Sequence, residues 1–497
     1  MTLIERHEKA AKILPSAGSF IAGERYTAGA VGTFDHINPA TGRTQANIPL
    51  SGTDAVDAAV AAAHAAAPAW RETPGTKRRE ILEKLAELLI KNGDELATIS
   101  TLENGVTMGF GATQFVHFAA EWTRYYAGWA DKLEGLVVNA PSDAPFVYTI
   151  PEPFGVVGII ITWNAPLLSL AMKIPPALAA GNTVVLKPAE FTPFTSLRFL
   201  ELAREAGLPD GVLNLVIGGP ETGAAISAHP GINKISFTGG PLTATKIMQS
   251  AANNLVPVLF ELGGKGANLV FDDANLAEAI PYSATFSLVN TGQGCALPTR
   301  LLVQRGVYDA VVEGVKSVVS HHVTGDPLDP TTFAGPLVND AALQRVSGVI
   351  EKAKFEKAGR LILGGGRPGG ELSNGFFVDT TIFADVDPQS SLAQNEVFGP
   401  VLSIIPFETE EQAVEIANST AYGLTNYVQT TDMRRALRLA RQLRSGTVGI
   451  NGTGNMNVGA PFGGVGISGF GREGGREGVM EFVSTKTVLI GNKGMFG

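Results

Sequence analysis

Residues 155–164 read Gly-Val-Val-Gly-Ile-Ile-Ile-Thr-Trp-Asn and begin the most regular part of the sequence. Apolar, β-branched runs of this kind predict strands at 156–161, 183–186, 213–217, 234–237 and 256–260. Helical stretches are expected between them at 174–180, 195–206, 221–228 and 242–252. This alternation indicates a parallel sheet covered on both faces, whose ligands bind beyond the carboxyl ends of the strands.

The sequence on either side extends this α/β pattern. Downstream strands are expected at 268–271, 300–303 and 401–406, with helices at 275–288, 307–320, 411–417 and 432–444. Upstream helices are expected at 54–69, 77–91 and 115–129, followed by an extended segment over 131–150. The tail at 482–490 is a strand-like run with no downstream partner. It must therefore pair elsewhere, and a second subunit is one candidate.

Composition excludes several classes of protein. The chain has 497 residues with 38 Lys and Arg against 47 Asp and Glu, a net charge of −9. Its length predicts roughly two to four domains. The acidic balance and the lack of a basic run argue against a nucleic-acid partner. An apolar share of 44% with only 17% charged residues argues against disorder.

The N-terminal residues mix acids and bases without an apolar core, unlike a signal peptide. The longest aliphatic stretch, at 156–161, is far shorter than the roughly 20 residues that span a bilayer. The single cysteine, Cys295, cannot form an intramolecular disulfide. We therefore expect a soluble, cytoplasmic protein without a membrane partner.

Two motif searches favour structural readings. Gly-x-Gly-x-x-Gly occurs at 464–469 and 469–474, but neither copy follows a strand in a βαβ unit. A glycine-rich turn is the better interpretation. The seven histidines show no ligand spacing, so no metal is expected.

Residues 290–296, Asn-Thr-Gly-Gln-Gly-Cys-Ala, contain the lone cysteine. A solitary cysteine is often an inert buried hydrophobe. The small and polar neighbours of Cys295 instead indicate exposed backbone and access for a reactant. From this stretch alone, Cys295 could be either a nucleophile or an inert buried thiol.

Chemically useful side chains follow three of the predicted strands. Glu261 ends one strand, Asn164 follows another, and Lys187 with Glu190 follows a third. A thiol, a carboxylate and an amide donor are the groups that acyl chemistry on sulfur requires. Their shared position at strand ends favours a site over three unrelated surface turns.

In this order and spacing, the sequence resembles the NAD(P)-dependent aldehyde dehydrogenase superfamily over about residues 20–490. The matching pieces are Trp163-Asn164, Lys187-Pro-Ala-Glu190, Phe237-Thr-Gly239, Glu261-Leu-Gly-Gly-Lys265, Gly292-Gln-Gly-Cys295, Glu396-Val-Phe-Gly-Pro400 and Pro461-Phe-Gly-Gly464. The resemblance implies an α/β fold with two Rossmann-like parallel-sheet domains and a β-strand oligomerisation arm. It also implies self-association as a dimer or tetramer.

The implied division of the chain has three parts. Residues 1–129 and 151–261 would form the coenzyme-binding domain, and 262–470 the catalytic domain. Residues 130–150 and 471–497 would form the arm, which would place the unpaired tail strand across a subunit boundary.

The resemblance also implies roles for site residues. Cys295 would be the nucleophile and Glu261 the general base, while the Asn164 amide and the Cys295 backbone N–H would form the oxyanion hole. Glu473 matches a position sometimes given a proton-relay role. The implied coenzyme-binding residues are Trp163, Lys187, Glu190, Gly239, Gly240, Glu396 and Phe398. A carboxylate at Glu190 would repel a 2′-phosphate, so NAD is favoured over NADP as the cofactor.

The sequence departs from many relatives along the implied substrate tunnel. Ala165, Ser169 and Met172 replace larger side chains, while Phe462 is retained. These residues predict a wide apolar tunnel for bulky aldehydes, such as aromatic or terpenoid ones. As an alternative, the loop 451–460, with Asn455, Met456 and Asn457, refills the space.

Two other functions are compatible with the same fold. A CoA-acylating semialdehyde dehydrogenase would usually lack the base at Glu261, so the sequence disfavours it. A catalytically silent structural homologue should have lost the nucleophile, the base or the oxyanion amide. Cys295, Glu261 and Asn164 are all present, which favours an active enzyme.

Overall fold

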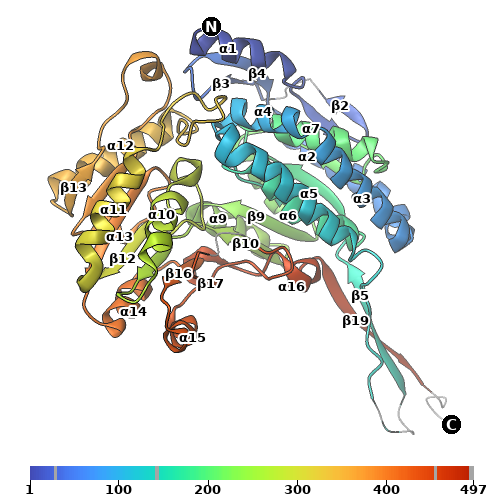
Figure 1. Cartoon of the computed structure of the whole chain (residues 1–497). Helices are drawn as coiled ribbons and strands as arrows, with labels where there is room; N and C mark the ends of the chain where they lie inside the picture. The colour runs from blue at the N-terminus through green and yellow to red at the C-terminus, as the bar shows by residue number, and fades with distance from the viewer. Residues whose placement is uncertain (27–30, 140, 142–144, 453–455, 492–497) are drawn as a thin grey trace.

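The computed structural model describes residues 1–26, 31–139, 141, 145–452 and 456–491. Two large sheets flanked by helices form the body, and a narrow two-stranded arm extends from it (Figure 1). The predicted α/β class with two mostly parallel sheets is confirmed.

The first sheet has the strand order β18-β10-β9-β6-β7-β8-β1-β2. Its strands are β1 (Ser19–Ile21), β2 (Glu24–Tyr26), β6 (Val156–Ile160), β7 (Thr183–Lys187), β8 (Leu213–Leu215), β9 (Lys234–Gly239), β10 (Val258–Leu262) and β18 (Gly469–Phe470). Strands β6 to β10 run parallel to one another, so the five strands predicted in this region are confirmed.

Helices cover both faces of this sheet. They are α2 (Thr53–Glu72), α3 (Gly75–Lys91), α4 (Gly93–Asn104), α5 (Thr113–Ala127), α6 (Pro166–Ala179), α7 (Phe194–Glu205), α8 (Pro220–Ala228) and α9 (Pro241–Ala252). Helix α4 was not predicted, and α6 begins eight residues before the predicted 174. Pro166 starts α6 at a position where its missing N–H leaves no hydrogen bond unmade. No helix among the described residues is both long and apolar enough to span a membrane.

The strands of the first sheet are apolar on both sides because two cores use them. Val156 and Ile160 of β6 belong to the core shared with α2, α8 and α9. Val157 and Ile159 belong to the core shared with α3, α5, α6 and α7. Successive side chains of a strand point to opposite faces, so a doubly covered strand becomes a continuous apolar run.

The second sheet has the strand order β13-β14-β15-β12-β11-β16-β17. Its strands are β11 (Ala267–Val270), β12 (Arg300–Gln304), β13 (Arg360–Leu363), β14 (Thr381–Ala384), β15 (Val401–Phe407), β16 (Thr425–Gln429) and β17 (Thr447–Ile450). Its longer helices are α10 (Leu276–Phe286), α11 (Tyr308–Ser320), α12 (Asp340–Phe355), α14 (Glu410–Asn418) and α15 (Met433–Gln442). Strands β11, β12 and β15 were predicted; β13, β14, β16, β17 and helix α12 were not.

The remaining elements are short or peripheral. They are α1 (Leu3–Ala10), the antiparallel pair β3 (Thr33–Ile37) and β4 (Thr44–Pro49), α13 (Ser391–Gln394) and α16 (Gly475–Met480). In Figure 1, α1 and the β3–β4 pair lie at the top of the molecule, at the end opposite the arm.

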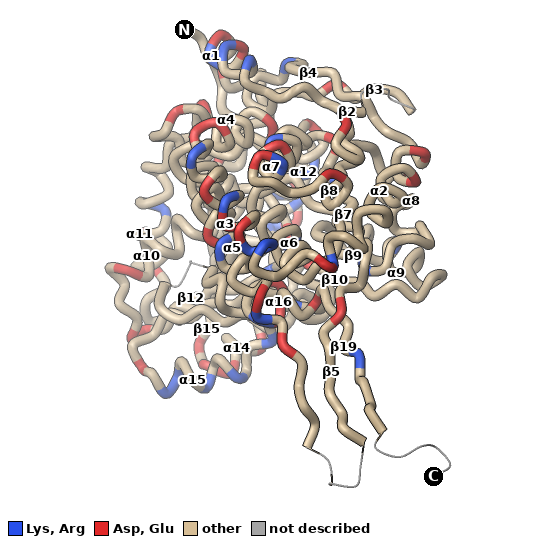
Figure 2. Tube along the Cα trace, turned by 90° about the vertical axis from the view of Figure 1, so that its right-hand side faces the viewer, with Lys and Arg blue, Asp and Glu red and all other residues tan. Residues whose placement is uncertain are grey.

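The arm corrects one prediction about the tail. Strand β19 (Val483–Ile490) pairs antiparallel with β5 (Phe146–Pro153) of the same chain, from Val483 opposite Pro153 to Ile490 opposite Phe146. The two strands run side by side away from the body (Figure 2). The tail strand therefore finds its pairing partner within the chain and not in a second subunit. That partner is the eight-residue strand at 146–153, which overlaps the last five residues of the predicted extended segment 131–150. The place of the arm across a subunit boundary stays a prediction.

The glycine-rich turn closes the edge of the first sheet. Gly469 and Phe470 form β18, which pairs antiparallel with Glu261 and Phe260 of β10. Gly469 has a φ of 108°, and a side chain there would overlap the carbonyl oxygen of Phe260. Residues 469–470 lie within the range predicted for the second domain, but they belong to the first sheet.

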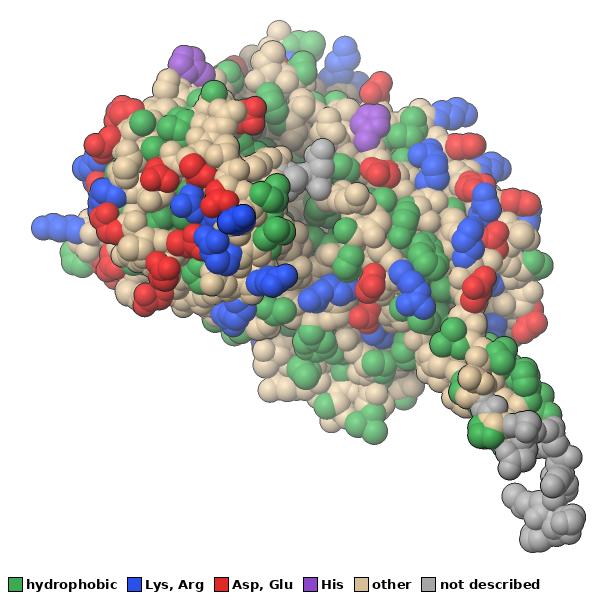
Figure 3. Space-filling view, turned by 60° about the horizontal axis from the view of Figure 1, so that its bottom comes forward, with side chains coloured by type: hydrophobic (Ala, Val, Ile, Leu, Met, Phe, Trp, Pro, Cys, Tyr) green, Lys and Arg blue, Asp and Glu red, His purple; other side chains and the backbone are tan. Residues whose placement is uncertain are grey.

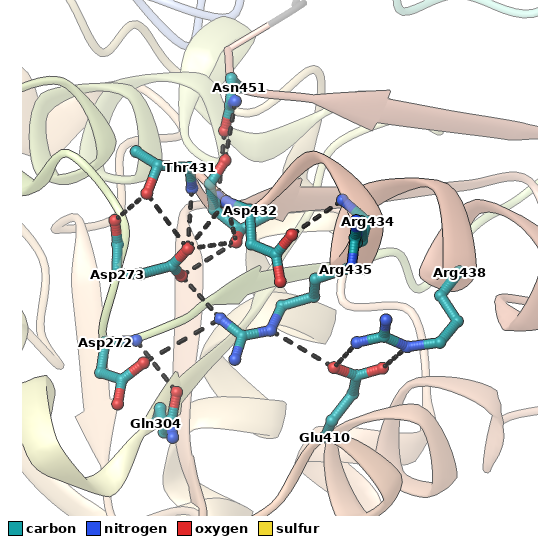
Figure 4. Close-up of polar contacts among 11 residues, drawn as sticks. Asp272, Asp273, Gln304, Glu410, Thr431, Asp432, Arg434, Arg435, Arg438 and Asn451 are labelled. Atoms are coloured by element: carbon teal, nitrogen blue, oxygen red, sulfur yellow. Dashed lines mark hydrogen bonds and ion pairs between the residues drawn. The ribbon is translucent and has the colours of Figure 1, made fainter.

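An ionic network joins the residues that follow β11 to those that follow β16 in the second sheet (Figure 4). The Asp273 carboxylate, just after β11, accepts hydrogen bonds from the backbone N–H groups of Thr431 and Asp432 at 3.0 and 2.9 Å. Arg435 of α15 reaches Asp273 at 2.7 Å and Glu410 of α14 at 3.3 Å. The chain after β16 is thereby held against the end of β11.

Buried Arg300 of β12 joins the second sheet to the loop that follows β10. Its guanidinium donates to the carbonyl oxygens of Ile416 and Ala417 at 2.8 and 2.7 Å, near the end of α14. It also donates to the carbonyl oxygen of Lys265 at 3.0 Å. Buried carbonyl groups need such partners because water cannot replace them.

We predict that Arg300→Met lowers the free energy of unfolding by at least about 3 kcal/mol, because three carbonyls lose their donor at about 1–3 kcal/mol each. Chemical unfolding followed by circular dichroism measures the change. Arg305→Met is the control, since it removes an exposed ion pair with Glu408 and a cation–π contact with Tyr308 and should change the value by about 1 kcal/mol. Equal effects of the two substitutions would contradict this role of Arg300.

Candidate active site

The parallel strands of the first sheet bring the predicted residues to one edge. Neighbouring parallel strands end at the same side of a sheet. Lys187 is the last residue of β7, Gly239 is the last residue of β9, and Glu261 lies one residue before the end of β10. Asn164 follows β6, just before α6. The predicted position of these groups at strand ends is confirmed.

Cys295 comes to this edge on an irregular loop from the other half of the chain. The loop begins with a tight turn at Val289–Gly292, in which Asn290, Thr291 and Gly292 have positive φ values. Cys295 is half-buried, which fits a thiol with access for a reactant rather than one sealed in the core. A side chain at Gly264 would overlap the Cys295 carbonyl oxygen, so the loop after β10 touches the cysteine backbone directly.

The Asn164 side chain contacts the cysteine loop. Its Nδ2 donates to the carbonyl oxygen of Gln293 at 2.9 Å, two residues before Cys295. Asn164 is 9% exposed. An amide nitrogen carries two hydrogens, so the second is free to donate to another acceptor. The geometry fits the oxyanion-hole role implied for Asn164.

Glu261 is a buried carboxyl group without a hydrogen-bond partner. It is 3% exposed, and neither carboxylate oxygen has a partner among the described residues. Burial raises its pKa well above the usual range, the charge of Glu473 raises it further, and Lys173 opposes the shift. A carboxyl group of this kind is typical of a functional site because a structural role would give it partners.

On balance, the surroundings of the Cys295 thiol disfavour its thiolate form. Burial raises the pKa of the Cys295 thiol to about 12, and the nearby charges of Glu261 and Glu396 contribute to the rise. The thiol of the free protein is therefore protonated at neutral pH. A depressed pKa or a nearby base is needed for rapid attack, and the free protein does not supply the depressed pKa.

Sequence reasoning missed Lys173, which lies on α6 beneath the site. Its ammonium is fully buried, forms an ion pair with Glu473 and donates to Ser236 Oγ at 2.9 Å. Glu473 is also buried, and its charge acts on Glu261. A lone lysine within an otherwise apolar helix was the signal that could have identified Lys173, because a buried charge requires a partner.

The first group of coenzyme-binding candidates lies at the carboxyl ends of β7 and β9. Lys187 Nζ lies 3.7 Å from Glu190 Oε2, and Lys187 is buried while Glu190 is partly exposed. Gly240 begins α9, and a side chain there would meet open space within 4 Å. An open helix start with a cation and a carboxylate nearby fits the pyrophosphate and ribose of a dinucleotide.

The second group of coenzyme-binding candidates contains Glu396, which lies near enough to Cys295 to act on its thiol, and the ring pair Trp163 and Phe398. Glu396 Oε1 accepts a hydrogen bond from the backbone N–H of Gly264 at 2.8 Å, and burial raises the Glu396 pKa to about 7. The rings of Trp163 and Phe398 meet edge to face at 5.4 Å. Arg345, which sequence reasoning assigned no role, donates to the Phe398 carbonyl at 3.2 Å and so holds this segment.

The predicted tunnel residues are all buried. Ala165, Ser169 and Met172 follow one another at the start of α6 at helical spacing, while Phe462 pairs through its backbone with Glu473. Met456 and Val458 belong to the same hydrophobic cluster as Met172, Phe462 and Cys295. This packing is consistent with a loop that occupies part of the space. Asn455 lies outside the described residues.

No group of three or more His, Cys, Asp or Glu side chains in the described part of the chain is placed to hold a metal ion. The polar groups that lie near Cys295 come from both halves of the chain, with Asn164 and Glu261 from the first sheet and Glu396 from the second.

Comparisons with known proteins agree with this geometry. The model of the aldehyde dehydrogenase family matches residues 26–488. An aldehyde dehydrogenase from Alternaria alternata is 42% identical over 476 residues, which cover 95% of each chain. The structure of gamma-glutamyl-gamma-aminobutyraldehyde dehydrogenase from Burkholderia cenocepacia is 38% identical and has a TM-score of 0.95, with coverage of 99% of this chain and 100% of that one. Betaine aldehyde dehydrogenase from Staphylococcus aureus, in complex with NAD+, is 34% identical with a TM-score of 0.94, and the match covers 98% of this chain and 97% of that one.

We predict that the rate at which iodoacetamide alkylates Cys295 in the free protein rises about tenfold per pH unit between pH 7 and 9. The thiolate is the reactive form, and a pKa of about 12 keeps its fraction small and growing throughout this range. Mass spectrometry measures the rate without ambiguity, because the chain has one cysteine. Cys295→Ser is the unlabelled control, and a rate that levels off below pH 8 would contradict the raised pKa.

Proposed function

Because the chain belongs to the aldehyde dehydrogenase family, we propose that it oxidises an aldehyde to the carboxylic acid through a covalent bond to Cys295, with NAD as coenzyme. The observation that carries this proposal is the meeting of three groups at one point. The Asn164 amide bonds to the loop of Cys295, and the unpartnered Glu261 carboxyl group acts on the same thiol.

NAD fits the residues at the carboxyl edge of the first sheet. The Staphylococcus aureus relative was solved with NAD+. In this chain, Lys187 and Glu190 would bind the adenosine ribose, Gly239 and Gly240 would admit the pyrophosphate, and Glu396 would bind the nicotinamide ribose. When bound, NAD supplies a hydride acceptor and a positive charge that favours the Cys295 thiolate. The carboxylate of Glu190 accepts hydrogen bonds from a ribose 2′-hydroxyl and repels a 2′-phosphate, which favours NAD over NADP.

The first covalent step takes place on Cys295. The Cys295 thiol would lose its proton to a base, its Sγ would form a bond to the aldehyde carbon, and the carbonyl oxygen would become an oxyanion. The free N–H of Asn164 Nδ2 and the backbone N–H of Cys295 would donate to that oxygen. Loss of one such donor typically raises the barrier by about 2.7–4 kcal/mol. As the oxyanion re-forms a carbonyl, the hydride on that carbon would pass to the bound NAD, and a thioester would remain on Cys295.

Hydrolysis of the thioester requires a base, and Glu261 is placed for this role. It would take a proton from water as the water oxygen attacks the thioester carbon, and the thiolate of Cys295 would leave. The Glu473 carboxylate and the Lys173 ammonium lie behind Glu261 and offer a route for that proton. This is the relay role that the resemblance implied for Glu473.

The Glu261 carboxyl group disfavours both alternative functions, a CoA-acylating dehydrogenase and a catalytically silent homologue. A CoA-acylating enzyme transfers its acyl group to a thiol and has no use for a base that activates water. A catalytically silent homologue has no reason to keep a buried carboxyl group without partners, since such a group destabilises the fold. Hydrolysis to the free acid is the function that Glu261 supports.

The proposed substrate is a bulky apolar aldehyde, such as an aromatic or terpenoid one. Ala165 and Ser169 at the start of α6 are small and would leave room where larger side chains would narrow the tunnel, and the buried Met172 and Phe462 would keep its wall apolar. Neither Arg nor Lys occurs among these residues, which disfavours an aldehyde that carries a carboxylate.

The domain division and self-association belong to the same proposal. Residues 1–129 and 151–261 would form the coenzyme-binding domain, 262–470 the catalytic domain, and 130–150 with 471–497 the arm. The arm carries exposed apolar side chains that include Phe146, Leu489 and Ile490, and Figure 3 shows green side chains along its described part. A second copy of the chain would cover them in a dimer or tetramer.

Glu261→Gln is expected to lower the steady-state rate of NADH formation by about 10²–10⁴, because the general base for hydrolysis is lost. A first burst of about one NADH per site should remain, since the thioester can still form. Cys295→Ala should abolish both the burst and the steady rate. Turnover in Cys295→Ala would contradict the proposed chemistry.

Ala165→Phe is expected to lower kcat/KM for an aromatic aldehyde at least tenfold while changing the value for acetaldehyde less than threefold, because the ring narrows the tunnel without touching the reacting groups. Stopped-flow or steady-state NADH assays over aldehydes of increasing bulk measure this difference. In the unmodified protein, a kcat/KM that is highest for two-carbon aldehydes and falls with each added carbon would contradict the wide tunnel.

A further inference from the structure

Asn290 lies at the centre of a closed set of hydrogen bonds beside Cys295. Its Nδ2 donates to the carbonyl oxygen of Asn164 at 3.0 Å and to that of Gln293 at 3.1 Å. The Gln293 carbonyl is also the acceptor for Asn164 Nδ2 at 2.9 Å. Asn290, Asn164 and Gln293 therefore tie the segment after β6 to the loop that carries Cys295.

The backbone at Asn290 has an unusual conformation. Asn290 and Thr291 have φ values of 51° and 54°, and Gly292 has a φ of 69°. Three consecutive residues in the left-handed region are rare, and residues other than glycine adopt it with strain. Asparagine tolerates this region better than most residues because its side chain is short and polar. The turn directs the Asn290 side chain back toward Asn164.

Neighbouring segments hold this turn in place. Thr291 Oγ1 donates to the Gly335 carbonyl at 3.2 Å and accepts from the Gly335 N–H at 3.0 Å. Gln293 Oε1 accepts from the Val338 N–H at 3.1 Å. A side chain at Gly292 would overlap the Gly399 carbonyl oxygen, so the turn also packs against the segment after Glu396. A strained turn that the surroundings fix in this way is typical of functional sites.

We infer that Asn290 is a positioning residue, which sets the Asn164 amide against the Cys295 loop so that one N–H of Asn164 faces the reacting carbonyl oxygen. This inference rests on the proposed function and extends it by one residue. Both hydrogens of Asn290 Nδ2 already have acceptors, so Asn290 itself does not contact the substrate. It acts through Asn164.

Two requirements at position 290 separate the candidate substitutions. The residue must adopt a positive φ, and it must present two N–H donors to two carbonyls. Glycine meets the first requirement and fails the second. Aspartate matches asparagine in shape and tolerates the same φ, but it offers only acceptors to the two carbonyls. Asn290→Gly and Asn290→Asp therefore test the hydrogen bonds apart from the backbone strain.

The chain offers a matched control in Asn182, which lies outside the site. Its Nδ2 also bridges two carbonyls, those of Ala177 at 3.1 Å and Phe482 at 2.9 Å, and it is fully buried. Asn182 Oδ1 also accepts from the Gly155 N–H at 3.0 Å, so Asn182→Gly removes three side-chain hydrogen bonds, one more than Asn290→Gly. It should lower the melting temperature by at least as much as Asn290→Gly, without a specific effect on the reaction.

The experiment is a double-mutant cycle between Asn290→Gly and Asn164→Ala, read by hydrolysis of p-nitrophenyl acetate and by NADH formation from an aldehyde. In the ester assay, the Cys295 thiolate displaces p-nitrophenolate and water then releases acetate, so the assay requires the oxyanion donors but no coenzyme. We expect Asn290→Gly and Asn290→Asp to lower kcat about 10–100-fold in the presence of Asn164. With Asn164→Ala already present, Asn290→Gly should lower it by less than about threefold further. The dissociation constant for NAD should not change.

Two kinds of result would overturn the inference. Asn290→Gly could lower kcat by the same factor with and without Asn164, or Asn182→Gly could lower it as much, and either result would make Asn290 a structural residue only. Unchanged kcat in both Asn290 variants would have the same meaning. If the unmodified protein hydrolyses the ester but forms no NADH with any aldehyde, the proposed function fails, and the ester assay still decides the role of Asn290.

Discussion

The hydrogen bond from Asn164 Nδ2 to the Gln293 carbonyl joins the two halves of the molecule where the chemistry takes place. Asn164 follows a strand of the first sheet, whereas Gln293 lies in the part of the chain that builds the second sheet. The other groups of the site depend on this junction, because Glu261 and the loop after it approach Cys295 only where the two halves meet. Gly264 permits that approach, since a side chain there would overlap the Cys295 carbonyl.

The site contains several polar groups that are unfavourable for stability. Glu261 is buried without a hydrogen-bond partner, and the Lys173–Glu473 ion pair lies beneath it, away from water. Burial of such groups destabilises the fold unless they are paired. The same burial raises the pKa of Glu261 and of the Cys295 thiol. The fraction of each group in its ionised, reactive form therefore depends on what binds at the site. These groups lower the free energy of unfolding, and they lie where substrate and coenzyme are expected to bind.

The sequence predicted the five parallel strands of the first sheet, β6 to β10, because these strands are mostly apolar and buried on both faces. Strand β16 was missed since it reads Thr-Asn-Tyr-Val-Gln, although all five residues are buried. Its polar side chains are satisfied by tertiary partners, such as Asn426 with the Ala267 N–H, and local sequence does not show such partners. The antiparallel partner of the tail strand lies more than 300 residues upstream, beyond any local pattern. Cys295, Glu261 and Asn164 could be proposed from the sequence because each lies in or beside a recognisable stretch, whereas Lys173 and Arg345 make contacts with residues far along the chain.

The central claim is that an acyl group passes through Cys295 under the control of Asn164 and Glu261. Intact-protein mass spectrometry of Glu261→Gln, mixed with an aromatic aldehyde and NAD and quenched in acid within a second, tests it most directly. The account predicts a mass increase equal to one acyl group, located on the peptide that contains Cys295, and a much smaller increase in Asn164→Ala. Full NADH formation in the unmodified protein with no adduct on that peptide in Glu261→Gln would contradict it.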